Sequence, residues 1–345
     1  MVVKTAMIAV VGRPNVGKST LTNLLTGEKV AIVSPKPQTT RNRIFGVFKY
    51  CDTQMILLDT PGFHKARTRL GDYMVGVIRE SVADVDVAAL VVEPVDSIGT
   101  QEEMLIGHIE ASGVPAVLII NKIDTISPGL VLPVIERYSQ RFGFGAIVPV
   151  SGKTGDGIPQ LLEVLDRYAQ EGPMLFPEGV TTDQPEKQIV AEIIREKLLI
   201  CLDKEIPHGT AVEITRFSER ETAQAGEERE TAQASAEDEP RLTASECEPL
   251  QTDAGREAAQ AGEEFDGDCI IDVEATIYCE KASHKGMIIG KNGAMLKRIG
   301  SMARVDIERF MGAKVNLQTW VKVKVNWRDS QSMIRNLGYI SGGGK

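Results

Sequence analysis

Short apolar runs alternate with amphipathic stretches through roughly the first 170 residues, which is the order that a doubly wound α/β sheet requires. The runs predicted to be strands are Ala6–Val11, Arg43–Lys49, Thr53–Leu58, Val87–Val92, Ala116–Ile120 and Ala146–Val150. The stretches predicted to be helices are Ser19–Leu25, Leu70–Ala83, Gln101–Ser112, Leu130–Arg141 and Pro159–Ala169. Ligands bind beyond the carboxyl ends of the strands in such a sheet, so polar motifs that directly follow these strands are the candidates for a site.

The pattern changes after residue 172. Proline and glycine are dense over 173–187, which predicts a linker. An amphipathic helix is expected over Gln188–Leu202, and strands over Thr210–Phe217, Cys269–Cys279 and Leu317–Trp327. In the last strand Val321, Val323 and Val325 would share one face, with Lys322 and Lys324 on the other. We therefore expect a doubly wound α/β domain over 1–172, a smaller α+β domain over 188–330 and a C-terminal tail over 331–345.

An acidic insert interrupts the second domain at 219–268. The segment E-R-E-T-A-Q-A-G-E from Glu219 recurs as E-R-E-T-A-Q-A-S-A from Glu228, with a third copy, R-E-A-A-Q-A-G-E-E, from Arg256. Few of its residues are large and apolar, so we expect disorder. Two roles stay open: a polyanion that competes with RNA for a neighbouring basic face, or a tolerated loop expansion, which we favour.

Composition is that of an ordinary globular protein, with 42% hydrophobic and 25% charged residues among 345. Five cysteines without a C-x-x-C pair favour a reducing, cytoplasmic location rather than a zinc site or a disulfide framework. No apolar run reaches the ~18 residues that span a bilayer, and the first strand begins too early for a signal peptide.

Charge is distributed unevenly along the chain. The net charge of −9 combines −4 over residues 1–218, −12 over residues 219–268 and +7 over residues 269–345. The basic C-terminal part is therefore the candidate for binding nucleic acid.

A phosphate-binding loop follows the first predicted strand. Its pattern is Gly-x-x-x-x-Gly-Lys-Ser, and a helix follows it, which is the context that the motif needs. Backbone N–H groups of this loop would surround phosphate oxygens, Lys18 would reach the β- and γ-phosphates, and Ser19 would hold Mg²⁺. The residues expected to bind nucleotide here are Gly12, Arg13, Pro14, Asn15, Val16, Gly17, Lys18, Ser19 and Thr20.

Two further segments are expected to respond to the γ-phosphate. Asp59-Thr60-Pro61-Gly62 follows a strand directly, so Asp59 can reach Mg²⁺ through water and the Gly62 N–H can meet the γ-phosphate. Upstream, either Thr39 or Thr40 would complete the Mg²⁺ shell, and the spacing does not choose between them. The expected metal ligands are thus Ser19, Thr39 or Thr40, and Asp59.

The base is predicted to be guanine. In Asn121-Lys122-Ile123-Asp124 the Asp124 carboxylate can accept hydrogen bonds from the guanine N1–H and amino group, a donor pair that adenine lacks. Asn121 would address the base edge and the Lys122 stem would cover the ring. Ser151-Gly152-Lys153 follows the last strand and would place a backbone N–H near the guanine carbonyl.

A second motif, Gly290-Lys291-Asn292-Gly293, precedes a helix expected to begin near Ala294. Such a G-x-x-G loop clamps the backbone of about four nucleotides in KH domains. Basic residues surround it, so the expected RNA-binding residues are Lys285, Gly290, Lys291, Asn292, Gly293, Lys297 and Arg298.

Together G-R-P-N-V-G-K-S-T, P-Q-T-T-R-N-R-I, D-T-P-G-F-H, N-K-I-D and K-G-M-I-I-G-K-N-G resemble the Era family of bacterial GTPases. The resemblance covers the chain except the acidic insert. It implies a Ras-like GTPase domain followed by a type II KH domain, with GTP or GDP and Mg²⁺ as ligands. It also implies binding of the 3′ end of small-subunit rRNA, a role in small-subunit assembly, and peripheral contact with the inner membrane. Neither a DNA partner nor an obligate protein partner is indicated.

Hydrolysis is expected to be slow. Ras-like switches use a Gln after the D-x-x-G glycine to orient the attacking water, and Phe63 stands there in this chain. The side-chain carbonyl of Asn15 could instead ligate K⁺ beside the phosphates. The candidate catalytic residues are Asn15, Lys18, Thr39, Thr40 and Gly62.

Two alternative functions stay open at this point. One is an RNA-binding assembly chaperone whose nucleotide pocket is structural and turns over negligibly. The other is a tRNA-modification GTPase, against which the missing C-terminal catalytic cysteine and the Gly290–Gly293 loop argue.

Overall fold

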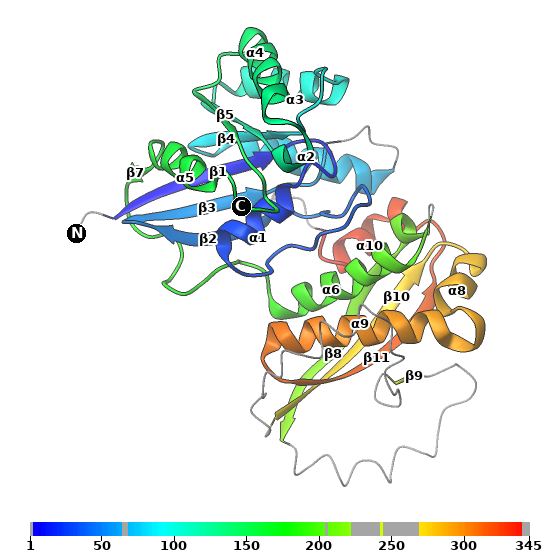
Figure 1. Ribbon diagram of the computed structural model, residues 1–345. Coiled ribbons are helices and arrows are strands. Elements are labelled where there is room, and N and C mark those ends of the chain that lie inside the picture. The colour runs from blue at the N-terminus through cyan, green and yellow to red at the C-terminus, as the bar shows by residue number, and fades with distance from the viewer. Residues whose placement is uncertain (1–2, 64–67, 204–205, 222–241, 244–268, 340–345) are drawn as a thin grey trace. The chain divides into compact units, whose positions relative to one another are not determined.

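The computed structural model describes residues 3–63, 68–203, 206–221, 242–243 and 269–339. It divides into two compact units, the first formed by 1–185 with 328–345 and the second by 186–327 (Figure 1). Most of the expected acidic insert, 219–268, lies outside the described residues, as do the last six residues of the chain.

The first unit is built on a sheet with the strand order β2-β3-β1-β4-β5-β6. All neighbours along this path are parallel except β2 and β3, which form an antiparallel hairpin, and β7 adds antiparallel to β1. The strands are β1 Lys4–Val11, β2 Ile44–Tyr50, β3 Thr53–Asp59, β4 Val87–Val92, β5 Ala116–Ile120, β6 Ala146–Pro149 and β7 Gln170–Glu171. The predicted doubly wound α/β fold is confirmed, as a mixed rather than an all-parallel sheet.

Helices cover both faces of this sheet because successive strand residues point to opposite sides. Ile8 and Val10 pack with α1 and α5 on one face, whereas Ala9 and Val11 pack with α2, α3 and α4 on the other. The helices are α1 Lys18–Thr26, α2 Arg69–Ala83, α3 Thr100–Ser112, α4 Val131–Arg141, α5 Ile158–Asp166 and α10 Gln331–Asn336. The carboxyl ends of the central strands are thereby left open for the loops that carry the motifs.

The segment after α5 runs along the edge strand β2. The Val47 N–H donates to Thr181 O at 2.7 Å, and Gly46 forms a bridge with Thr182. The Gln54 side chain accepts from the backbone N–H groups of Leu175 and Phe176 at 2.8 and 3.1 Å. These bonds fix the course of the chain where proline and glycine predicted only a linker.

The second unit has the sheet order β8-β10-β11-β9, with β10 antiparallel to β8 and parallel to β11. Apolar residues of α6 and α9 form one core with the inner face of this sheet (Figure 1). The elements are α6 Glu186–Cys201, β8 Ala211–Glu221, β9 Leu242–Thr243, β10 Cys269–Cys279, α8 Ala282–Ile289, α9 Ala294–Met311 and β11 Lys314–Val323.

The predicted bounds of the last strand are wrong. The strand expected over Leu317–Trp327 begins at Lys314 and stops at Val323, so the three valines do not share a buried face. Val321 is 5% exposed, whereas Val325 is 70% exposed. Trp327 is buried in a short 3₁₀ turn and its Nε1–H donates to Gly209 O at 2.8 Å, which ends the strand and anchors the chain there.

The expected C-terminal tail contains a helix. Residues 331–336 form α10, which belongs to the first unit although it follows the second in sequence. Ser330 caps it through a long contact of 3.5 Å from the Met333 N–H to the Ser330 hydroxyl, and Ile334, Leu337 and Tyr339 are buried.

Candidate nucleotide and RNA sites

The phosphate loop joins β1 to α1 in a conformation that depends on glycine. Gly17 has φ +99, and a Cβ there would lie 2.2 Å from Asn121 Nδ2, so any larger residue is excluded. The Asn121 amide donates to Val16 O at 2.8 Å and closes the loop against the end of β5. The predicted strand–loop–helix context is present, with the N-terminus of α1 facing the loop.

Lys18 is buried at the base of the loop, 6% exposed. Its Nζ donates to Gly12 O and Arg13 O, each at 3.1 Å. Burial lowers the pKa of the Lys18 ammonium to about 8, and the nearby Asp59 carboxylate opposes that shift. The ammonium is thus held by backbone carbonyls at the place where a phosphate would approach.

Three oxygen-bearing side chains meet beside Lys18. The Ser19 hydroxyl donates to Asp59 Oδ2 at 2.6 Å and lies 2.9 Å from the Thr40 hydroxyl. The second Asp59 oxygen, Oδ1, is buried and has no hydrogen-bond partner among the residues that the structure describes. Burial raises the pKa of the Asp59 carboxyl to about 6, against the effect of Lys18 and Ser19.

These groups fit Mg²⁺, which prefers hydroxyl and carboxylate oxygens and retains several waters. A buried carboxylate oxygen without a partner is a group that a cation or its water would satisfy. The part of the chain that is described contains no group of three or more His, Cys, Asp or Glu residues that could hold a metal ion. The two threonines considered as Mg²⁺ ligands differ in their surroundings. The Thr40 hydroxyl lies beside that of Ser19, whereas the Thr39 hydroxyl donates to Lys36 O at 2.6 Å.

The Asp59–Gly62 segment is tied to the phosphate loop. The Phe63 N–H donates to Gly12 O at 3.1 Å, which brings Gly62 against Pro14. The Phe63 side chain is 4% exposed and packs edge-on against His108, with ring centroids 5.7 Å apart. This side chain faces the core and offers no group to orient a water molecule.

The base-recognition residues come together at the ends of β5 and β6. Asn121 is 2% exposed, and its Oδ1 accepts from the Gly152 N–H at 2.9 Å. The buried Ser151 hydroxyl donates to Asp124 Oδ1 at 2.7 Å and orients that exposed carboxylate. Asn121 thus bonds at both ends of its amide to backbone, which makes it a tether between the phosphate loop and the Ser151–Lys153 loop.

Lys122 reaches across to the phosphate loop. Its Nζ donates to Asn15 O at 2.6 Å and to Glu93 Oε1 at 2.5 Å. Glu93 was not selected from the sequence, although it directly follows β4 in the same way as the other site residues follow their strands. The Asn15 side-chain amide donates to Pro35 O at 2.6 Å, which links the phosphate loop to the segment before Thr39.

A cavity of about 320 Å³ lies among these loops. It is lined by the phosphate loop, by the segment around Thr39 and Thr40, by Gly62 and by Lys122. Ligand-binding clefts at the carboxyl edge of open α/β sheets have this location.

The motifs in the sequence do not predict the contacts of the C-terminal segment, residues 328–339. It contacts the chain next to the two segments expected to respond to the γ-phosphate, which are those around Thr40 and Gly62. Arg41 Nη1 donates to the Tyr339 hydroxyl at 3.3 Å, and Asn42 Nδ2 donates to Gly338 O at 3.2 Å. The Tyr73 hydroxyl of α2 donates to Asn42 Oδ1 at 3.0 Å, and the rings of Tyr73 and Tyr339 are 6.3 Å apart.

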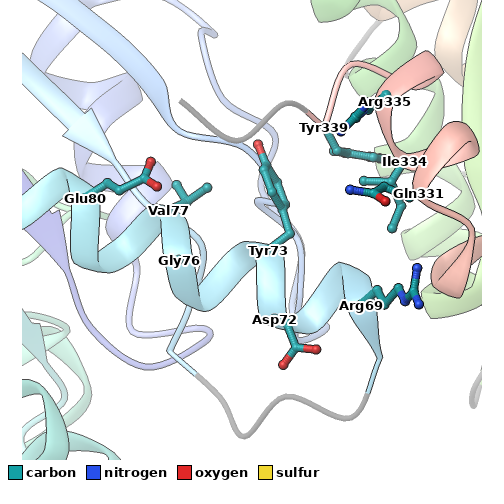
Figure 2. Close-up of a pocket in the computed structure, with 10 residues that line it drawn as sticks. All are labelled: Arg69, Asp72, Tyr73, Gly76, Val77, Glu80, Gln331, Ile334, Arg335 and Tyr339. Atoms are coloured by element: carbon teal, nitrogen blue, oxygen red, sulfur yellow. The ribbon is translucent and has the colours of Figure 1, made fainter. Parts of the chain in front are cut away.

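A cavity of about 810 Å³ lies between α2 and α10, and Figure 2 shows the side chains of both helices around it. Arg69 at the start of α2 donates its N–H to Asp329 at 3.1 Å. The C-terminal segment therefore contacts both the end of the Thr39–Thr40 segment and the helix that follows Gly62.

The G-x-x-G loop of the second unit joins α8 to α9. Gly290 has φ +74, and a Cβ there would lie 2.7 Å from Met295 Cβ, so glycine is required for α9 to begin where it does. Lys291, Asn292, Lys297 and Arg298 are exposed around this loop, Lys285 is half-buried, and Gly293 is buried. Exposed positive side chains thus flank the loop that precedes the N-terminus of α9, and both are groups that can bind backbone phosphates.

Two family models match the chain. One, described as 50S ribosome-binding GTPase, matches residues 7–122, and one described as KH domain matches residues 256–328. No helix in the described part of the chain is long and apolar enough to span a membrane.

Curated relatives cover nearly the whole chain. GTPase Era of Ruminiclostridium cellulolyticum is 45% identical over 336 residues, 97% of either chain. GTPase Era of Alkaliphilus oremlandii is 41% identical over 339 residues, 98% of this chain and 100% of the relative.

Solved structures agree with these relatives. A crystal structure of Era with MgGDPNP and nucleotides 1506–1542 of 16S ribosomal RNA has a TM-score of 0.80 at 32% identity and covers 98% of this chain and 99% of its own. A variant of Aquifex aeolicus Era bound to GDP and aluminium fluoride has the same TM-score and identity, over 97% of this chain and 99% of its own.

Proposed function

Because the chain belongs to the Era family of GTPases, we propose that it is a GTP-hydrolysing switch that binds single-stranded ribosomal RNA and assists assembly of the small ribosomal subunit. One observation carries the nucleotide part: Lys18, Ser19, Thr40 and the unpartnered Asp59 oxygen converge beside the phosphate loop. The RNA part rests on the exposed basic residues around Gly290–Gly293 and on the relative solved with 16S rRNA nucleotides. The 3′ end of small-subunit rRNA is therefore the RNA to test first.

The phosphate loop binds the triphosphate and Lys18 neutralises its β- and γ-oxygens. Ser19 and Thr40 would ligate Mg²⁺ directly and Asp59 through water; the bound ion supplies positive charge to the β- and γ-phosphates. Thr40 is preferred over Thr39 because its hydroxyl lies 2.9 Å from that of Ser19. The Gly62 N–H would meet the γ-phosphate, so both sensing segments lose a contact upon hydrolysis.

Guanine specificity comes from the Asp124 carboxylate, which Ser151 orients. Asn121 positions the surrounding loops, and the stem of Lys122 covers the base. The Ser151–Lys153 loop would place a backbone N–H near the guanine carbonyl, which adds a contact that the adenine amino group would not accept.

Hydrolysis proceeds without a side chain that positions water at residue 63, so the intrinsic rate is slow. The Asn15 carbonyl would ligate K⁺ next to the β- and γ-phosphates and stabilise the charge that develops there. Replacing K⁺ with Na⁺ in a turnover assay should lower the rate, and an unchanged rate would exclude this cation site.

Location and membrane contact follow from the family resemblance alone. We place the protein in the cytoplasm, with peripheral contact at the inner face of the cell membrane. Flotation of the purified chain with anionic vesicles tests that contact, and absence of binding at low salt would remove it.

The main test is multiple-turnover GTP hydrolysis by the full chain with and without the 3′-terminal rRNA segment. The proposal predicts Mg²⁺-dependent turnover that is specific for GTP. Stoichiometric binding without turnover would instead indicate an RNA-binding assembly chaperone with a structural nucleotide pocket.

A further inference from the structure

The first side chain of the phosphate loop, Arg13, is held by two carboxylates rather than aimed at phosphate. Its Nη2 donates to Glu93 Oε2 at 2.8 Å, and its Nε forms an ion pair with Glu102 Oε1 at 2.6 Å. Glu93 directly follows β4, and Glu102 is in the first turn of α3 with 4% of its side chain exposed. Arg13 thereby fastens the phosphate loop to rigid elements of the sheet and its covering helix.

The other carboxylate oxygen of Glu93, Oε1, contacts the Asn121–Asp124 motif, which we expect to bind the base. Glu93 Oε1 lies 2.5 Å from Lys122 Nζ, and the same Nζ donates to Asn15 O at 2.6 Å. One carboxylate therefore joins a cation of the phosphate loop to a cation of the Asn121–Asp124 motif. Lys122 also has φ +65, a conformation that L residues adopt only when the surroundings enforce it.

The ion pairs among Arg13, Glu93 and Lys122 are not explained by a contribution to folding stability. The side chains of Arg13, Glu93 and Lys122 are 27–37% exposed, and pairs of that exposure contribute little to folding stability. The ion pair between Glu93 and Lys122 instead fixes the position of Lys122. An unrestrained lysine samples many rotamers, whereas the stem of Lys122 must lie flat on the base.

We propose that Glu93 is a positioning residue for nucleotide binding: it holds Lys122 over the base and against the phosphate loop, so that the two halves of the site close on the nucleotide together. This inference rests on the proposed binding of guanine nucleotide. Glu102 supports this role of Glu93 because it fixes Arg13, the partner of Glu93 Oε2.

The opposite effect is also physically possible, which makes the sign of the result decisive. Removing the Glu93 charge leaves Arg13 and Lys122 less neutralised near an anionic ligand, and that change alone would strengthen phosphate binding. If Glu93 positions Lys122, removing its charge should weaken nucleotide binding. If Glu93 only neutralises Arg13 and Lys122, removing its charge should tighten nucleotide binding.

The test is dissociation of fluorescently labelled GDP from the full chain, chased with excess unlabelled GDP. Glu93→Gln keeps the size of the side chain but supplies only one acceptor oxygen, and should release GDP about five to ten times faster, as expected for losing one charged hydrogen bond. Its melting temperature without nucleotide should stay at the value of the unsubstituted chain, because these partly exposed ion pairs contribute little to folding stability.

Two comparisons show whether Glu93 acts through Lys122. In a Lys122→Ala background, Glu93→Gln should have no additional effect on GDP release, because the group that it positions is absent. Glu103→Gln is the matched control, since Glu103 is on the same helix as Glu102 but pairs with Arg141; it should leave release unchanged.

Slower release, unchanged release, or an effect that persists fully in the Lys122→Ala background would overturn the positioning role. Failure of the unsubstituted chain to bind labelled GDP at all would refute the proposed function instead, so the two failures are distinguishable.

Discussion

At the scale of single residues, we propose that discrimination between purines depends on one carboxylate. Asp124 is exposed and accepts from the Ser151 hydroxyl through Oδ1. Guanine offers two donors to this group, and adenine offers none in that arrangement.

Asp124→Asn should therefore weaken GTP binding roughly a hundredfold, because two hydrogen bonds to a charged acceptor are lost or impaired. The variant should gain affinity for xanthosine triphosphate, whose carbonyl in place of the amino group accepts from the new amide. Competition binding with GTP, xanthosine triphosphate and ATP measures both effects. Equal GTP affinity in the variant would show that the base is recognised elsewhere.

A second prediction separates the adjacent threonines. Thr40→Ala removes the hydroxyl next to Ser19 and should raise the Mg²⁺ concentration needed for half-maximal GTP turnover about tenfold, with GDP affinity little changed. Thr39→Ala removes a hydroxyl that bonds to Lys36 O and does not lie beside Ser19, so the change should stay within about twofold. A larger effect at Thr39 would reverse the assignment.

Some residue roles could be predicted from the sequence and others could not. The proximity of Lys18, Ser19 and Asp59 follows from the sequence pattern, because Lys18 and Ser19 open α1 and Asp59 ends β3, at the edge where the strands of the sheet end. Glu93 and the tethering role of Asn121 depend on which loops face each other across that edge. That information lies in the strand order, which the hydrophobic pattern does not encode.

At the scale of elements, the C-terminal segment contacts both γ-phosphate-sensing segments. Tyr339 is 4% exposed, bonds to Arg41 and packs near Tyr73, while Gly338 O accepts from Asn42. These contacts give the sensing segments a physical connection to the end of the chain that leaves the RNA-binding unit.

Tyr339→Ala should loosen residues 40–43 and 69–83, since it removes a buried aromatic ring and its hydrogen bond, at a cost of about 3 kcal/mol to local stability. Faster amide hydrogen exchange in those peptides measures the effect. Arg335→Ala, at an exposed position of α10 shortly before Tyr339, is the matched control. Unchanged exchange in the Tyr339 variant would mean that the segment merely rests on the surface.

The elements themselves were largely predictable where the apolar pattern was strong. β4 and β5 match their expected bounds because every residue in them is buried. The strand now seen as β11 was extended too far, since the alternation of Val and Lys continues past Val323 while the backbone does not. α10 was missed because six residues carry too little periodicity to distinguish a helix from a tail.

At the scale of the whole molecule, the acidic insert is the feature with the least assigned role. Replacing residues 244–266 with a short glycine–serine linker leaves β8 and β9 unchanged. If the insert is a tolerated expansion, RNA affinity at low salt should change by less than about twofold. A marked rise in affinity would instead favour competition between the polyanion and RNA for the basic surface.

The division of the chain into two units suits a switch, because nucleotide chemistry and RNA binding reside in separate cores. A ligand at one site can influence the other only if the two nucleotide states differ in their free energy of RNA binding. The chain passes between the two units after residue 185 and again after residue 327, and such a difference would act through these two covalent connections.

The most direct measurement is the affinity of the full chain for single-stranded RNA carrying the 3′ end of small-subunit rRNA, with Mg²⁺ and either a non-hydrolysable GTP analogue, GDP or the matching ATP analogue. A guanine-nucleotide switch predicts the tightest binding with the GTP analogue, weaker binding with GDP, and no effect of the ATP analogue beyond that of buffer. Equal affinity in all states, or a response to the ATP analogue, would contradict it.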